Sequence, residues 1–406
     1  MHAHIAGITP TCCSDFLHPL HKSSGGRSLM LVATALAILG LAGLRPALAQ
    51  TETVLHSFNG KDGSYPFARL SIDGQGNLYG TNGGNPVPPA TSASIFKLSP
   101  TGKLAVPFRT AATGICNLCI DNLLRDHQGN LYGTEAAAGS SGNGAVFKLT
   151  PAGSFTVLYN FTGGTDGKYP NDGLVSDEQG NLYGTTGLGG AFGQGVIFEV
   201  TPAGVEQVLY SFTGGADGGT PWGRLLRDSQ GNLFGTTYAD GALKLSFGVV
   251  FKLAPDGVES VLHSFTGGSD GGHPNGDLIA DSQGNLYGTT PSVNDGPHGT
   301  VFKITQQGLL TVLHTFSGSD GFDPRSGVIM DASGNLVGTT WSGGAFGDGV
   351  AYQLAPDGTE TVLHSFSGPD GSLPVGGVVF DQQGNLYGST AYGGAFNDGV
   401  VFKLTF

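Results

Sequence analysis

Charged residues are scarce in this chain. Only 12% of its 406 residues are Asp, Glu, Lys or Arg, about half of the usual share. The 18 basic and 31 acidic residues give a formal net charge of −13 at pH 7. A shortage of Lys and Arg disfavours nucleic acids and anionic membrane surfaces as partners. We therefore expect no nucleic acid partner.

No apolar run reaches the roughly 20 residues of a membrane-spanning helix. The run Leu29–Leu44 has 16 residues, follows Lys22 and Arg27, and precedes a small-x-small motif ending at Ala49. This pattern predicts a signal peptide over residues 1–49 and a protein that is secreted, periplasmic or at the cell surface, without a membrane contact after cleavage. An uncleaved anchor and a start codon further downstream stay open as alternatives.

Cysteine is also rare, with four in the chain. Cys12 and Cys13 lie in the predicted signal peptide, which leaves Cys116 and Cys119 in the motif C-N-L-C. A lone CxxC pair makes a poor zinc site, and no helical pattern follows it as a thioredoxin-like redox site requires. We expect a local disulfide between these two residues, which an exported chain permits, and no cofactor.

Glycine, by contrast, is abundant: the chain has 71 Gly and 21 Pro. Such a composition can signal disorder, but 24 Phe, 12 Tyr and regular Val, Ile and Leu runs supply the apolar surface that disordered chains lack. The glycines show no three-residue period, which excludes collagen. A folded chain with many tight turns is therefore expected, and this indicates an all-β protein.

A tetrapeptide G-N-L-Y, or a near variant, recurs seven times. Its Asn residues are separated by 53, 51, 51, 53, 50 and 50 residues and are Asn77, Asn130, Asn181, Asn232, Asn285, Asn335 and Asn385. A period of this length is typical of a solenoid or a propeller.

Each repeat contains four short runs of aromatic and β-branched residues between turn-forming clusters. In the third repeat these runs are Gly173–Ser176, Asn181–Thr186, Gly195–Val200 and Val208–Phe212. Four antiparallel strands of this size form one propeller blade. We therefore predict a seven-bladed β-propeller over residues 50–406, most simply a monomer.

The two ends of the propeller region are complementary. The sequence after the signal peptide begins with a fourth-strand run at about residues 53–58, and the chain ends with a third-strand run, Val400–Leu404. Pairing these runs would complete the last blade and remove exposed sheet edges. This permutation favours a closed ring over an open solenoid.

The repeats share the pattern S-F-x-G-G-x-D-G-x-x-P, then L-x-x-D-x-x-G-N-L-Y-G-T-T, then G-V-V-F-K-L-x-P-x-G. Over residues 53–406 this pattern resembles the GloVer tandem-repeat proteins, a choice-of-anchor group of exported bacterial proteins. The resemblance implies no established activity. Members often end in an anchoring segment, whereas this sequence stops directly after a strand. The D-x-x-G-N-L-Y core is more loosely similar to NHL-type and streptogramin-lyase propellers.

Two positions after the loop proline vary among repeats whose neighbouring positions do not. We expect them at the mouth of the central channel, on the face with the longer loops, where binding usually occurs. Aromatic rings beside planar donors suit a glycan or an anionic group, although these side chains could merely fill the channel. The candidate ligand-binding residues are Phe67, Arg69, Asn122, Asn171, Trp222, Arg224, Asn275, Asp277 and Arg325, with Trp341 in a nearby loop.

Three sets of residues could hold metal ions, but we expect none to do so. A repeated loop Asp supplies one carboxylate per loop, fewer than calcium requires, and is explained by an Asx or β-turn. A His in the fourth strand is replaced by Tyr in two repeats, which favours a half-buried structural ring. Asp270, His273, Asp295 and His298 of the fifth repeat are a weak alternative as a mixed metal site.

The sequence favours a non-catalytic binding or scaffold protein with a glycan or protein ligand. No G-x-S-x-G, H-E-x-x-H, P-loop or dinucleotide motif occurs in a plausible context. Catalytic residues are therefore unassigned. A propeller enzyme such as a lyase or hydrolase is the alternative, because propellers host both classes.

Overall fold

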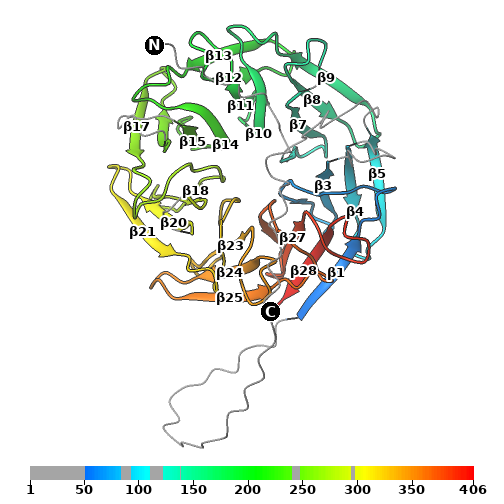
Figure 1. Cartoon of the computed structure of the whole chain (residues 1–406). Helices are drawn as coiled ribbons and strands as arrows, with labels where there is room; N and C mark the ends of the chain where they lie inside the picture. Colours follow the sequence, from blue (N-terminus) through cyan, green and yellow to red (C-terminus); the bar gives the residue numbers. More distant parts are fainter. Residues whose placement is uncertain (1–50, 84–92, 110–121, 138, 240–246, 294–297) are drawn as a thin grey trace, which may run out of the picture.

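A computed structural model describes residues 51–83, 93–109, 122–137, 139–239, 247–293 and 298–406. These residues form seven four-stranded antiparallel sheets that are arranged in a ring (Figure 1). The predicted seven-bladed propeller is confirmed. The predicted signal peptide, Cys116, Cys119 and Asp295 lie outside the described residues. No helix in the described ranges is long and apolar enough to cross a membrane.

Each blade is numbered along the chain, and its strands are given from the centre of the ring outward. Blade 1 contains β2 (Ser71–Ile72), β3 (Leu78–Asn82), β4 (Ser94–Leu98) and β5 (Leu104–Arg109), and blade 2 contains β6 (Leu124–Arg125), β7 (Leu131–Glu135), β8 (Ala145–Leu149) and β9 (Phe155–Asn160). Blade 3 contains β10 (Lys168–Ser176), β11 (Leu182–Leu188), β12 (Val196–Val200) and β13 (Glu206–Ser211). Blade 4 contains β14 (Gly219–Arg227), β15 (Leu233–Ala239), β16 (Val249–Leu253) and β17 (Glu259–Ser264).

The remaining blades follow the same order. Blade 5 contains β18 (Ile279–Ala280), β19 (Leu286–Thr290), β20 (Thr300–Ile304) and β21 (Leu310–Thr315). Blade 6 contains β22 (Ile329–Met330), β23 (Leu336–Thr340), β24 (Val350–Leu354) and β25 (Glu360–Ser365). Blade 7 contains β26 (Val378–Phe380), β27 (Leu386–Thr390), β28 (Val400–Thr405) and β1 (Thr51–Ser57).

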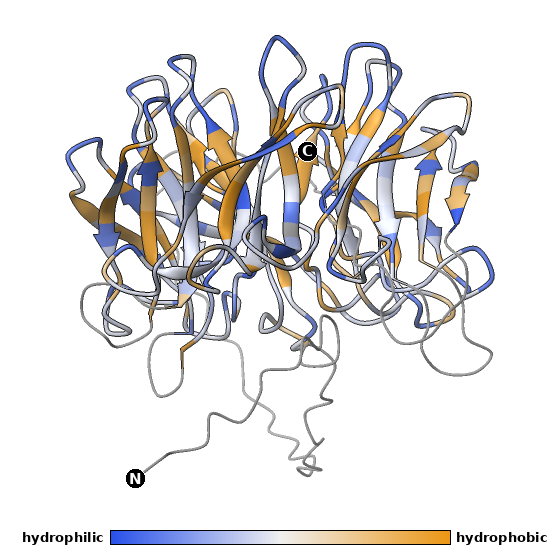
Figure 2. Cartoon of the chain, turned by 90° about the horizontal axis from the view of Figure 1, so that it is seen from above, coloured by the Kyte–Doolittle hydropathy of each residue, from blue (hydrophilic) through white to orange (hydrophobic). Residues whose placement is uncertain are grey.

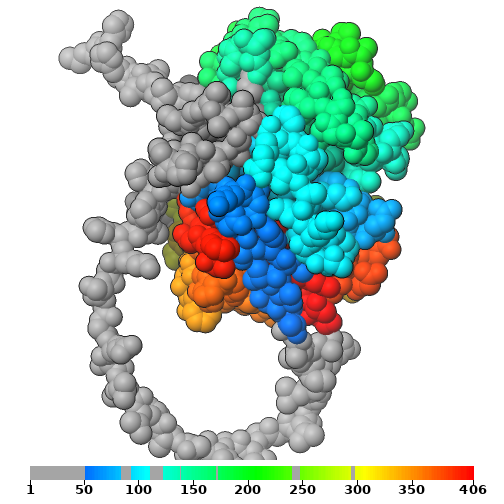
Figure 3. Space-filling model, turned by 90° about the vertical axis from the view of Figure 1, so that its right-hand side faces the viewer, coloured from blue at the N-terminus to red at the C-terminus, as the bar shows by residue number. Residues whose placement is uncertain are grey.

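Blade 7 is closed by the first strand of the described chain. β1 pairs antiparallel with β28, with Val54 opposite Phe402, and Figures 1 and 3 show the blue N-terminal strand beside the red C-terminal one. Phe58, directly after β1, is fully buried and its ring meets Phe96 of blade 1 edge-on at 5.3 Å. The predicted closure is thus confirmed, and the pairing begins two residues earlier than expected.

The D-x-x-G-N-L-Y motif builds the turn between the two inner strands of each blade. In blade 3 the carboxylate of Asp177 accepts hydrogen bonds from the backbone N–H of Asn181 (2.8 Å), its side-chain amide (2.9 Å) and the hydroxyl of Tyr183 (2.9 Å). Gly180 adopts φ of 84°, which suits glycine. One aspartate therefore fixes both the turn and the next strand.

Neighbouring blades are joined by a repeated glycine–proline contact. Gly349, directly before β24, adopts φ of 95°, and a Cβ there would lie 2.6 Å from Cδ of Pro374 in the next blade. Gly195 and Pro221 form the same contact between blades 3 and 4. The glycine of G-V-V-F and the loop proline are therefore repeated because they pack on each other.

Candidate functional site

The two faces of the ring carry different connections. The tight D-x-x-G-N and x-P-x-G turns lie on one face. The opposite face, here called the long-loop face, carries the outer-to-inner connections between blades and the loops between second and third strands. Figure 2 shows the blades from the side, with mostly hydrophobic strands between these two rims.

The residue before the loop proline is left-handed in six blades, although none of these residues is glycine. Their φ angles lie between 51° and 64°, and they are Tyr65, Tyr169, Thr220, His273, Asp323 and Leu373. Each backbone N–H donates a hydrogen bond of 2.7 to 3.0 Å to a carbonyl in the preceding blade. Left-handed non-glycine residues are strained, and such strain clusters at functional sites. This strain lies on the long-loop face.

Charged side chains from several blades meet at the centre of the ring. Nη1 of Arg69 in blade 1 lies 3.4 Å from Oδ2 of Asp277 in blade 5, and Nε of Arg224 in blade 4 lies 3.4 Å from the same oxygen. The backbone N–H of Arg224 also donates to Oδ1 of Asp277 at 3.2 Å. Because blades 1 and 5 are on nearly opposite sides, these contacts span the centre.

Two further polar residues extend this group. The side-chain amide of Asn122 in blade 2 accepts a hydrogen bond from the backbone N–H of Arg69 (2.6 Å) and donates to Asp172 in blade 3 (2.5 Å). We call Arg69, Asn122, Asp172, Arg224 and Asp277 the central cluster. Burial lowers the pKa of Arg69, and the nearby Asp277 carboxylate counters part of this effect.

Glycines at the equivalent inner positions leave room for the central cluster. A Cβ at Gly173 would lie 2.8 Å from Cβ of Asn122 and 3.1 Å from Cδ of Arg224. A Cβ at Gly327 would collide with the backbone of Asp277. Some blades therefore need glycine at this position so that the large polar side chains of the other blades fit at the centre of the ring.

A first group of aromatic rings lies where blades 4 and 5 meet. The ring centroid of Trp222 is 6.0 Å from that of Tyr238, and Tyr238 stacks on His273 at 4.6 Å. The ring centroid of Phe247 lies 5.3 Å from that of His273. Tyr238 remains 41% exposed, so this group presents an aromatic surface to solvent.

Two smaller groups lie around the same face. Tyr65 stacks with Phe67 at 6.3 Å and meets Tyr392 of blade 7 edge-on at 5.0 Å. In blade 6, the guanidinium of Arg325 lies 4.2 Å from the ring centroid of Trp341 and 2.7 Å from Asp323. Both tryptophans of the chain therefore lie on the long-loop face.

The structure brings together some of the sequence-predicted residues and separates others. Arg69, Asn122, Arg224 and Asp277 meet in the central cluster, whereas Phe67, Trp222 and the Arg325–Trp341 pair lie in three separate groups around it. Oδ1 of Asn275 is buried without a hydrogen-bond partner in the described part of the chain. The side chain of Asn171 lies outside the described residues.

Sequence reasoning missed several neighbours of these residues, namely Tyr65, Asp172, Tyr238, Phe247, Asp323 and Tyr392. Tyr65 and Asp323 occupy the position directly before the loop proline, which also varies among repeats. That variation was an available signal. The left-handed backbone that directs these side chains cannot be predicted from a residue type such as Tyr or His, which rarely adopts it.

The repeated loop Asp and the His or Tyr of the outer strand are partners. Nε2 of His364 lies 2.9 Å from Oδ2 of Asp370, and the hydroxyl of Tyr159 donates to Asp166 at 3.0 Å. Burial alone would raise the pKa of Asp166, but hydrogen bonds, chiefly from Thr162, lower it. These loop carboxylates therefore hold the connection between blades.

Glutamates at the start of four outer strands lie near these aspartates. Burial, followed by the negative charge of the neighbouring Asp, raises the pKa of each to about 7; they are Glu52, Glu206, Glu259 and Glu360. Oε1 of each is buried and finds no hydrogen-bond partner among the residues described. Leu104 and Leu310 occupy the same ladder position in blades 1 and 5.

The described members of the weak metal alternative have other partners. Asp270 binds His263 and Thr266, and Nδ1 of His273 lies 2.8 Å from the carbonyl of Tyr238. The ring of His298 packs near Phe322. Over the described ranges, no group of three or more His, Cys, Asp or Glu residues is arranged to hold a metal ion.

Comparison with known families identifies the repeat. The chain matches the Gloeobacter/Verrucomicrobia repeat at residues 44–171, 120–339 and 246–406. The chain belongs to this repeat family. The match agrees with the GloVer resemblance seen in the sequence. A search of curated proteins found no match to this chain.

Solved structures share the fold of this Gloeobacter/Verrucomicrobia repeat protein. Virginiamycin B lyase from Staphylococcus aureus is 15% identical, with a TM-score of 0.58 over 88% of this chain and 99% of the lyase. The extracellular domain of a protein described as a one component system from B. thetaiotaomicron is 12% identical, with a TM-score of 0.54. That match covers 83% of this chain and 38% of the other. At these identities the likeness is one of fold.

Proposed function

We propose that this chain is a non-catalytic binding protein that takes a glycan on its long-loop face, above the central cluster. The supporting observation is that partly exposed aromatic rings lie on the same face as guanidinium groups that are already held in place. Flat aromatic faces suit the apolar faces of sugar rings, and planar donors suit their hydroxyl groups.

The arrangement is preorganised, which favours binding. Arg325 is fixed by Asp323 on one side and Trp341 on the other, and Arg224 is fixed by Asp277. Side chains that are ordered before the ligand arrives lose less conformational entropy on binding.

We also propose that the protein works outside the cytoplasm of a bacterium. The predicted signal peptide over residues 1–49 supports this proposal. So does the fold shared with an extracellular domain from B. thetaiotaomicron.

A glycan array followed by titration calorimetry tests the binding proposal. At least one glycan should bind, and Trp222→Ala and Trp341→Ala should each weaken binding about tenfold or more, which corresponds to about 1.4 kcal/mol. Tyr287→Phe is the control, because Tyr287 belongs to the D-x-x-G-N-L-Y turn region and its hydroxyl donates to Asp281. Absence of glycan binding, or equal loss in the control, contradicts the proposal.

A further inference from the structure

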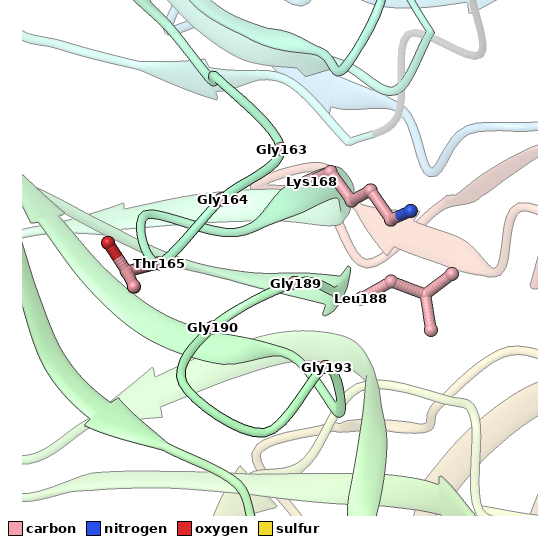
Figure 4. A pocket seen from close by; sticks show the side chains of 8 residues that line it. All are labelled: Gly163, Gly164, Thr165, Lys168, Leu188, Gly189, Gly190 and Gly193. Atoms are coloured by element: carbon pink, nitrogen blue, oxygen red, sulfur yellow. The ribbon is translucent and has the colours of Figure 1, made fainter.

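Blade 3 has a hollow of about 390 Å³ on the long-loop face (Figure 4). One wall is the glycine-rich loop before β10, with Thr165, and the other is the loop 189–193 after β11. Lys168 and Leu188, which are partners in the β10–β11 ladder, lie at one end of the hollow, and Figure 4 shows their side chains pointing to the same side, away from Gly190 and Gly193. This hollow is separate from the aromatic groups described above.

The ladder pair beside the hollow differs from blade to blade. The equivalent ladder partners are Phe322 and Ser342 in blade 6, and Ser372 and Tyr392 in blade 7. Each of those pairs includes an aromatic ring, whereas the pair is Gly219 and Ala239 in blade 4, and Lys168 and Leu188 in blade 3. The loops can approach closely because a Cβ at Gly189 would lie 2.6 Å from Cα of Gly167.

Among the described residues that line the hollow, Lys168 is the one that carries a charge. Its ammonium group lies 5.4 Å from the ring centroid of Tyr169, and the described part of the chain offers it no ion pair. The nearby Asp166 is buried and already accepts hydrogen bonds from Tyr159 and Thr162. A positive charge is thus available to a ligand.

The hollow is connected to the centre of the ring by one continuous strand. β10 begins at Lys168 and reaches Gly173, which packs against the central cluster. Lys168 and Gly173 are five residues apart, which places them at most about 18 Å from each other. An oligosaccharide that lies above the central cluster can therefore reach Lys168.

We propose that Lys168 and this hollow form a subsite for a single acidic substituent, a carboxylate or a sulfate, on the glycan bound at the long-loop face. This inference rests on the proposed function. One ammonium group matches one negative charge, and the net charge of −13 disfavours polyanions. At physiological ionic strength, salt screens interactions between charges that are more than about 8 Å apart. The ammonium group of Lys168 therefore affects the binding of a single acidic substituent more than the net charge of the protein does.

The test is a glycan array that pairs each neutral oligosaccharide with counterparts carrying one uronic acid or one sulfate. The wild-type protein should prefer an acidic form by about tenfold, equivalent to about 1.4 kcal/mol. Lys168→Ala should abolish this preference and leave neutral binding within about twofold, and Lys168→Arg should restore much of it. Lys61→Ala is the matched control, since Lys61 lies exposed in the corresponding loop of blade 1.

The outcomes separate the two proposals. Neutral binding without any acidic preference in the wild type overturns the subsite and leaves the glycan proposal standing. A preference that survives in Lys168→Ala, or an equal loss of neutral and acidic binding there, also overturns the subsite. Absence of all glycan binding overturns both. The preferred counterpart, uronate or sulfate, identifies the substituent.

Discussion

Arg69 and Asp277 are 208 residues apart in the sequence, yet their side chains meet at 3.4 Å across the centre of the ring. Arg224 approaches the same carboxylate oxygen, so one aspartate ties blades 1, 4 and 5 together. These contacts fix both guanidinium groups at the centre of the ring.

Replacing Asp277 tests the structural role of the central cluster. In Asp277→Asn, Arg69 and Arg224 lose their shared counter-charge while remaining half-buried. Removing one partner of a fully buried ion pair costs about 3–5 kcal/mol, and partial solvent access reduces this to about 1–3 kcal/mol. Urea unfolding measures the loss. A change below about 0.5 kcal/mol would show that the cluster does not stabilise the ring.

Replacing a glycine at a blade junction tests whether the glycine–proline contact stabilises the ring. Gly349→Ala places a Cβ 2.6 Å from Pro374 and forces alanine to φ of 95°, so both strain and collision arise. Gly384→Ala is the matched control, because Gly384 has φ of 83° but no atom within 4 Å of a new Cβ. Backbone strain alone costs about 1–2 kcal/mol. Calorimetry should show a clearly larger loss for Gly349→Ala, and equal losses would contradict the packing role.

Closure of blade 7 gives a third prediction. Deleting residues 51–58 removes the outer strand of blade 7 together with the buried Phe58, and should sharply lower the melting temperature. Phe58→Ala should cost about 3–5 kcal/mol through loss of burial and a cavity. Phe396→Ala, at a ring that is 62% exposed, serves as control and should cost under about 0.5 kcal/mol. An unchanged melting temperature after the deletion would contradict closure.

The sequence was sufficient for these features because they repeat. The spacing of the seven G-N-L-Y motifs gave the number of blades, and the runs near Val54 and Val400 gave the pairing of β1 with β28. Local turn chemistry and strand alternation determine a blade almost independently of its neighbours. The longer inner strands of blades 3 and 4 were not expected, because their extra residues lie in loop-like sequence.

The candidate site was predicted only in part. Varying positions pointed to Arg69, Arg224 and Asp277, but their mutual contact depends on the placement of blades far apart in the sequence. The partners Tyr238 and Asp323 were missed for a similar reason. Their positions follow from strand length and from a left-handed backbone that hydrogen bonds between blades stabilise.

The buried glutamates predict how stability depends on pH. The pKa of Glu206 is about 7 in the folded protein against an ordinary value of 4.5, so the folded state keeps a proton that the unfolded state loses. The stabilisation that the protonated Glu206 gives the folded state is complete below about pH 4.5. It is lost as the pH rises through 7. Glu52, Glu259 and Glu360 act in the same direction.

Denaturant unfolding between pH 4.5 and 8 measures this dependence. Stability should fall as the pH rises, and replacing the four glutamates by Gln should make this fall shallower. Glu135, whose pKa is also raised to about 7 by burial, should account for part of the remaining dependence. Below about pH 4 stability should fall again, because Asp166 and Asp217 have lowered pKa values and must then take up protons. A stability that rises from pH 5 to 8 in the wild type would contradict this account.

Hydrogen exchange of the full chain with and without a bound glycan tests the central claim most directly. We predict slower exchange at residues 65–69, 222–224 and 273–277 on the long-loop face. The D-x-x-G-N turns at residues 73–77 and 228–232 should be unchanged. Protection confined to those turns, or to the outer strands, would contradict a binding site above the central cluster.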